Sequence, residues 1–103
     1  MAGDRIERIK AMEEALNVTT AATEQLSEAI ATQVDALDAL RALSAYYGSQ
    51  EWFVDREADE RGKLPRDLAR GVLGEDLPYE ALVGAREAAL AALEVATAML
   101  RGL

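Results

Sequence analysis

Cysteine and histidine are both absent from this chain of 103 residues. Without them the protein has no disulfide bonds, no thiolate nucleophile, no iron–sulfur cluster and none of the common zinc ligand sets. A serine nucleophile would also lack the histidine that usually acts as its base. We therefore expect no metal site, no cofactor and no complete catalytic motif.

Basic residues are scarce, because 11 lysine and arginine residues stand against 19 aspartate and glutamate residues, which gives a net charge of −8. Proteins that bind nucleic acids or anionic membranes need basic side chains gathered on one face. The basic residues here form no such concentrated face. We therefore expect neither nucleic acid nor membrane as a partner.

Long apolar runs are also missing, since none approaches the roughly 18 residues that a membrane-spanning helix needs. The first residues, MAGDRIERIKAMEE, lack the apolar stretch of a signal peptide. We therefore expect a soluble, cytoplasmic protein.

Glycine and proline are absent between Asp4 and Tyr47, so neither residue type interrupts a long helix there. Apolar residues follow one heptad frame in this segment, at positions a and d: Ile9, Met12, Leu16, Leu26, Ile30, Leu37, Leu40 and Tyr47. Polar residues interrupt the seam at Thr19, Thr23 and Gln33. The pattern predicts a helix over 4–47 with an imperfect coiled-coil seam, in which the weak helix formers of 17–20 allow a bend or a break.

The remaining residues predict shorter elements. Ser49 is a good N-cap for a helix over 49–62, which Gly62 would end. A loop with a helical turn is expected over 64–77, and Asp76 can cap a last helix over 78–102. The fold class is therefore a single all-α domain, 1–103, in which the long first and last helices pack antiparallel as a helical hairpin or small bundle.

The lengths of the two long helices predict a second copy of the chain. At 1.5 Å per residue the first helix spans roughly 63 Å and the last about 36 Å, so the last cannot cover the first. An uncovered apolar stripe is unfavourable in water. We therefore expect a homodimer.

The middle of the chain holds all five aromatic residues: Tyr46, Tyr47, Trp52, Phe53 and Tyr79. Such a group near a helical turn is more often a buried plug between helices than a stacking platform for a ligand. Neighbouring residues cannot share one helical face. We therefore predict that one of Tyr46 and Tyr47, and one of Trp52 and Phe53, points outward and forms a binding face.

Acidic residues of the same segment are candidate metal ligands. The run Asp55-Arg56-Glu57-Ala58-Asp59 begins like a calcium loop, but Glu60 stands where such a loop needs glycine. Read as a helix, the segment aligns Glu51, Asp55 and Asp59 at a spacing of four. A solvated acidic face is the favoured interpretation, and a carboxylate- or metal-dependent enzyme is the alternative.

The middle segment resembles a bacterial family known as a domain of unknown function. Its members share a Tyr-Tyr-x-Ser-x-x-Trp core, an acidic stretch, a Leu-Pro and an Arg-Gly-Val-Leu-Ser-Glu-Asp run. This chain has Tyr46 to Trp52, then Leu64-Pro65, then Arg70 to Asp76, with Gly74 in place of the serine. The resemblance implies a small all-α protein and supplies no activity.

The shared positions that the resemblance carries over, together with the neighbouring Tyr46, are the candidate site residues: Tyr46, Tyr47, Ser49, Trp52, Asp55, Arg70, Gly71, Glu75 and Asp76. They form either a binding surface or a structural clasp in which Arg70 pairs with Asp55 or Asp76. The favoured function is a protein-interaction or structural module that presents this segment to a protein partner. A second alternative is a helical-hairpin secretion adaptor, although Trp52 is followed by Phe53 and Val54 rather than by the x-Gly of such proteins.

Overall fold

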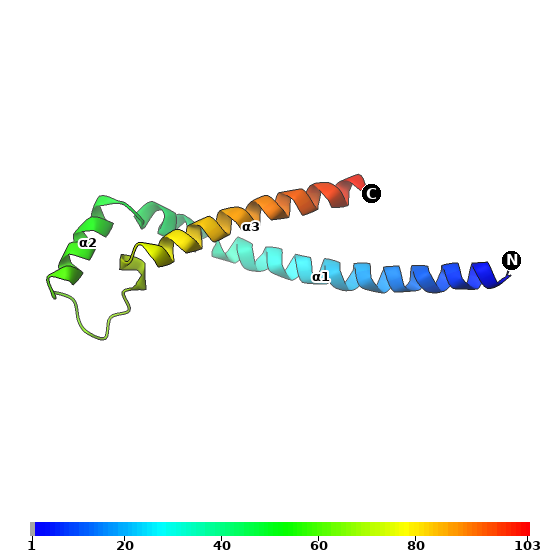
Figure 1. Ribbon diagram of the computed structural model, residues 1–103, viewed down its shortest axis with the longest axis horizontal. Helices are drawn as coiled ribbons and strands as arrows, with labels where there is room; N and C mark the ends of the chain where they lie inside the picture. The colour runs from blue at the N-terminus through cyan, green and yellow to red at the C-terminus, as the bar shows by residue number, and fades with distance from the viewer. Residues whose placement is uncertain (1) are drawn as a thin grey trace. The chain divides into compact units, whose positions relative to one another are not determined.

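The computed structural model describes residues 2–103, and all regular structure in that range is helical. Four elements follow one another along the chain: α1 (Ala2–Tyr46), α2 (Gln50–Glu60), the 3-10 helix η1 (Gly71–Leu73) and α3 (Asp76–Arg101) (Figure 1). The predicted all-α class, with a long helix at each end and short helical pieces between them, is confirmed.

The chain divides into two compact units, and the boundary between Leu37 and Asp38 lies within α1. In the first unit, residues 2–37 form one helix in which every side chain is exposed. The helix continues through Asn17 and Thr20, so the weak helix formers do not break it there. This segment has many alanines, which favour helix, and it has no proline and no glycine after Gly3 to interrupt the helix.

In the second unit, α1 ends and α2 begins within four residues. Gly48 has a φ of +79°, a conformation that ends the helix and that glycine adopts without a steric penalty. The Oγ of Ser49 then accepts a hydrogen bond from the backbone N–H of Trp52 at 3.2 Å, which confirms Ser49 as the N-cap of α2.

The end of α2 has a Schellman motif centred on Gly62. This glycine has a φ of +70°, its N–H donates to the Asp59 carbonyl, and the N–H of Lys63 donates to the Ala58 carbonyl, each at 3.0 Å. Such an end requires a left-handed residue just after the helix, which glycine supplies. The predicted helix stop at Gly62 is confirmed.

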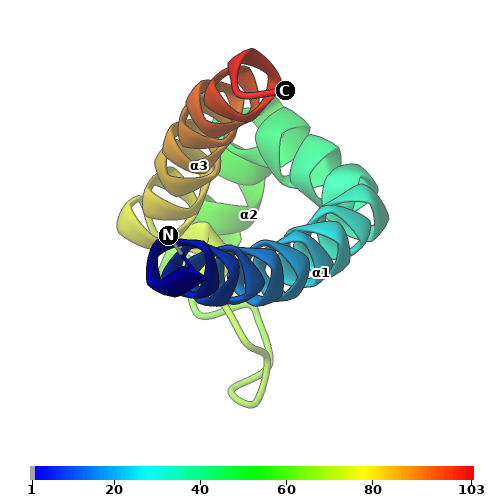
Figure 2. The same cartoon turned by 90° about the vertical axis from the view of Figure 1, so that its right-hand side faces the viewer.

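A loop then leads from α2 to η1 and α3, and Figure 2 shows it running away from α2 and returning. The prediction that Asp76 caps α3 is wrong, because Asp76 is already inside the helix, and Glu75 at the N-cap makes no side-chain cap bond. Asp76 instead lies in the first turn, where its charge favours the helix dipole. Pro78 follows in the same turn, where a missing N–H leaves no intrahelical bond unmade.

The core of the second unit is small. Trp52 is 3% exposed and Leu73 is 8% exposed, and Pro78 is the third buried residue of the described chain. These residues come from α2, η1 and α3, so burial joins three consecutive elements.

None of the helices in residues 2–103 combines the length and apolar character that crossing a bilayer would require. The single-domain organisation stays a prediction.

Candidate functional site: an aromatic and ion-paired clasp

Trp52 is the centre of the contacts between α2 and η1. Its indole Nε1–H donates a hydrogen bond to the Val72 carbonyl at 2.9 Å, so the buried ring has its polar atom satisfied. Tyr47 meets the Trp52 ring edge-on, with ring centroids 4.9 Å apart and planes 66° apart. This is a favoured aromatic geometry. We call residues 46–78 the clasp, because these contacts fasten the end of α1 and the start of α3 to α2.

Phe53 lies on the outer side of Trp52. Their ring centroids are 5.0 Å apart, yet Phe53 is 58% exposed and its neighbour Val54 is 57% exposed. The prediction that one of Trp52 and Phe53 points outward is therefore confirmed. For the tyrosines the same prediction is wrong, because Tyr46 and Tyr47 are both half-buried, each with its hydroxyl bonded to another part of the clasp.

Arg56 lies over the ring of Trp52. Its guanidinium carbon lies 4.6 Å from the indole centroid, and its Nη1 lies 3.2 Å from a carboxylate oxygen of Glu75. A cation over an aromatic face and an ion pair at the same group hold the arginine in one position. Glu75 is fixed twice, since its carbonyl also accepts the Tyr47 hydroxyl at 3.2 Å. The junction before α3 is thus tied to both α1 and α2.

Tyr46 and Asp55 link the end of α1 directly to α2. The Tyr46 hydroxyl donates to the Asp55 carboxylate at 2.5 Å. This hydrogen bond raises the pKa of Tyr46 to about 12, and burial and the negative charges of Asp55 and Glu51 act in the same direction. The tyrosine therefore stays a neutral donor across the physiological range. Asp55 is a structural acceptor in this arrangement.

Arg70 organises the loop that follows α2. Its Nη1 donates to the Asp59 carboxylate at 2.5 Å, its Nη2 to the Pro65 carbonyl at 2.5 Å, and its Nε to the Leu68 carbonyl at 3.3 Å. The predicted partners, Asp55 and Asp76, are wrong: Asp55 binds Tyr46, and Asp76 makes no side-chain hydrogen bond or ion pair in residues 2–103. The guanidinium fork suits this role because it reaches several acceptors at once.

Gly71 stands where η1 passes close to α3. A Cβ at this position would lie 3.1 Å from Cδ1 of Leu77, which is tighter than ordinary van der Waals contact. The glycine is therefore explained by the close approach of the two elements. Its φ lies outside the positive range, so backbone conformation adds nothing to the argument.

The carboxylates that sequence reasoning aligned on α2 are mostly engaged in protein contacts. Asp55 accepts the Tyr46 hydroxyl and Asp59 pairs with Arg70, while Glu51 is exposed. Within residues 2–103 no group of three or more acidic, histidine or cysteine side chains is arranged to hold a metal ion. Asp55 and Asp59 therefore make contacts between segments of the chain.

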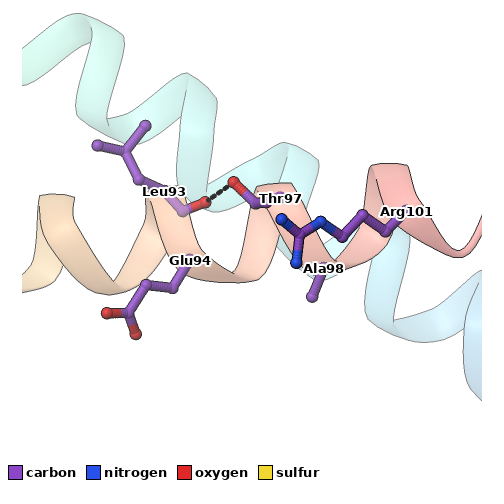
Figure 3. A pocket seen from close by; sticks show the side chains of 5 residues that line it. All are labelled: Leu93, Glu94, Thr97, Ala98 and Arg101. Carbon is purple, nitrogen blue, oxygen red and sulfur yellow. Dashed lines mark hydrogen bonds between the residues drawn. The ribbon is translucent and has the colours of Figure 1, made fainter.

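A shallow concavity on α3 is likewise formed by few residues. Its lining consists of Leu93, Glu94, Thr97, Ala98 and Arg101, all from one helix (Figure 3). The Thr97 hydroxyl is turned back to the Leu93 carbonyl at 2.8 Å. A threonine that bonds its own helix offers little to a ligand. This face carries no candidate chemistry.

The candidate site residues left out several residues of the clasp, among them Arg56, Asp59 and Val72. Arg56 had a usable signal, because it follows Trp52 by four positions and so lies on the same side of α2. Val72 takes part through its backbone carbonyl, which any residue possesses. No side-chain pattern could therefore have revealed it.

Comparison with known proteins gives a family but no activity. Neither the curated proteins nor the solved structures contain a match to this chain. A family model does match, over residues 9–95, which include most of α1, the whole clasp and most of α3. The chain therefore belongs to the family described as a domain of unknown function (DUF4298).

Proposed function

We propose that this protein is a helical interaction module in which the clasp is a structural joint and α1 is the binding surface. One observation carries the proposal. Large apolar side chains line residues 2–37 and are all exposed: Ile6, Ile9, Met12, Leu16, Val18, Leu26, Ile30, Val34 and Leu37. An apolar surface of this extent is characteristic of proteins that bind another protein.

The internal bonding of the clasp supports the joint role. Tyr46, Tyr47 and Arg70 direct their polar atoms to other parts of the same segment. A binding site needs polar groups free to meet a ligand, and these groups are already paired. The outward pair Phe53 and Val54 is the part of the clasp that a protein partner can reach.

A second copy of the chain is the partner that the helix lengths favour. At 1.5 Å per residue, the 45 residues of α1 span about 67 Å and the 26 residues of α3 span about 39 Å. The chain's own second long helix is therefore too short to cover α1. All the exposed apolar residues of 2–37 except Val18 fall on heptad positions a, d and e, which is the stripe that a paired helix buries. The module then works as a homodimer.

Analytical ultracentrifugation tests this proposal. We expect a concentration-dependent dimer of the full chain, and a shift to monomer when Leu16→Glu and Ile30→Glu place charges in the stripe. The matched control, Gln25→Glu with Thr32→Glu, adds the same charge on the opposite face and should leave the dimer intact. A full chain that stays monomeric at millimolar concentration, or a control that dissociates as readily as the stripe variant, would overturn the proposal.

A further inference from the structure

A groove in the second unit has an apolar floor and cationic edges. Its walls are the last turns of α1 and the first half of α3, with Leu40, Leu82, Ala85 and Ala89 as apolar lining and Arg41 and Arg86 as charged lining. The lining residues of α3 recur at spacings of three and four, so they share one face of that helix. The groove is therefore an open furrow along two helix faces.

The charges of this groove are opposite in sign to the net charge of the chain. Both charged residues of the lining are arginines, although the chain has 19 acidic residues against 11 basic ones. In residues 2–103 Arg86 makes no side-chain hydrogen bond or ion pair, and Arg41 has one ion pair, with Asp38 at 3.5 Å. The side chains of that pair are 72% and 98% exposed, and ion pairs so exposed contribute little. Both guanidinium groups can therefore accept a carboxylate partner.

The shape of the groove favours a helix as its occupant over a small molecule. Sites for small molecules enclose most of the surface of their ligand, whereas this groove has walls from two helices alone. Ala85 and Ala89 are small, and small side chains let another helix approach closely. An amphipathic helix fits such a surface through apolar side chains repeated every three or four residues.

We propose that this groove binds an amphipathic acidic helix of a partner protein. Apolar side chains of that helix would lie against Leu40 and Leu82, and its carboxylates would pair with Arg41 and Arg86. Pairs of guanidinium and carboxylate form strong hydrogen bonds. The apolar contact supplies the association, and the arginines select acidic helices over basic ones. The groove lies outside residues 2–37, so this proposal is independent of the homodimer.

Two synthetic helical peptides test the proposal by nuclear magnetic resonance of the isotope-labelled full chain. Both have leucine at heptad positions a and d, and they differ in having glutamate or lysine at positions e and g. We expect the glutamate peptide to shift the amide signals of residues 40–45 and 82–89, and the lysine peptide to bind there about tenfold more weakly. The net charge of −8 would favour the lysine peptide. Equal affinities at these signals, or shifts confined to residues 2–37, would overturn the inference.

A pair of arginine variants provides a second readout. Arg41→Glu with Arg86→Glu should weaken the glutamate peptide about tenfold or more and should strengthen the lysine peptide. Both arginines are exposed, so the fold should be retained. The matched control, Lys63→Glu with Arg66→Glu, makes the same change of net charge outside the groove and should leave the affinity nearly unchanged. If the control weakens the glutamate peptide equally, net charge rather than the groove is responsible, and the inference is wrong.

Two other occupants are separated by further measurements. Analytical ultracentrifugation of the arginine variant shows whether a second copy uses the groove: a dimer lost in this variant but kept in the control would overturn the inference. Decanoate, an aliphatic carboxylate, represents small amphiphiles. If it saturates the groove signals at lower concentration than the glutamate peptide does, a small amphiphile is the occupant and the helix is not.

Discussion

Residues 2–37 and the clasp differ in how far their side chains are buried and in whether they contact distant parts of the chain. The helix over residues 2–37 has every side chain exposed, and its side-chain hydrogen bonds and ion pairs, such as the Lys10 to Glu7 ion pair at 3.5 Å, stay within the helix. The clasp buries Trp52 and engages Tyr46, Tyr47 and Arg70 with residues distant in sequence. Residues 2–37 have secondary structure without tertiary contacts, whereas the clasp has tertiary structure.

This difference indicates where each region gets its stability. A lone helix in water is only marginally stable even when its residues favour helix, and most helical stability in proteins comes from burying an apolar face. The clasp buries side chains within itself, whereas residues 2–37 bury none. The variants below test that contrast.

Trp52→Ala should have the largest effect. It removes the most buried side chain and its hydrogen bond to the Val72 carbonyl. Truncating a buried aromatic residue destabilises a protein by about 3–5 kcal/mol, which is comparable with the whole stability of a small domain. Urea denaturation followed by circular dichroism should show the clasp unfolded or nearly so.

Phe53→Ala is the matched control, because it truncates the adjacent aromatic ring on the exposed side of Trp52. We expect a loss below about 1 kcal/mol, since little area is returned to water. Equal losses for the two variants would contradict the asymmetry between the buried and exposed rings.

Arg70→Ala should loosen the loop after α2 more than it destabilises the helices. The variant removes the donors to Asp59, Pro65 and Leu68. Because the side chains of Arg70 and Asp59 are 34% and 27% exposed, we expect a modest loss of about 1–2 kcal/mol. Limited proteolysis should show faster cleavage within residues 62–70. Arg66, in the same loop, makes no side-chain hydrogen bond or ion pair within residues 2–103, so Arg66→Ala should be cleaved at the original rate.

The two regions also differ in how much of their structure could be predicted from the sequence. The long helix follows from an uninterrupted stretch without proline and with many alanines, and the caps at Ser49 and Gly62 follow from local backbone chemistry. The partner of Arg70 does not follow, because Asp55, Asp59 and Asp76 are chemically equivalent acceptors and only the path of the loop selects among them. Local preferences are readable from the sequence, while pairings between segments depend on the fold.

Alkaline pH should weaken the clasp through Tyr46. The pKa of this hydroxyl is raised from 10.0 to about 12, chiefly by its hydrogen bond to Asp55. A group with a raised folded-state pKa stabilises the protein fully below the unfolded value and loses that contribution as the pH rises through the folded value. We therefore expect a contribution present below pH 10 that disappears between about pH 10 and 12.

Absorbance titration of tyrosine ionisation measures this effect. Tyr46→Phe should remove the ionisation near pH 12 and should lower stability at neutral pH by about 1 kcal/mol, through loss of one hydrogen bond. Tyr79→Phe, on the exposed face of α3, should leave that ionisation in place. An unchanged titration curve in Tyr46→Phe would refute the assignment.

The smallest expected changes in stability come from replacing a glycine by alanine in the backbone of the clasp and in the interior of a regular helix. The two changes have opposite signs. Gly62 has a φ of +70°, so Gly62→Ala forces a side chain into a left-handed conformation and should destabilise by about 1 kcal/mol, although no atom lies within 4 Å of the added Cβ. Gly84 lies inside α3 with nothing within 4 Å of an added Cβ, so Gly84→Ala should stabilise by about 0.5–1 kcal/mol. Thermal melts of both variants measure the pair. If Gly62→Ala raises the melting temperature as Gly84→Ala does, the left-handed turn after α2 is not a constraint that the clasp requires.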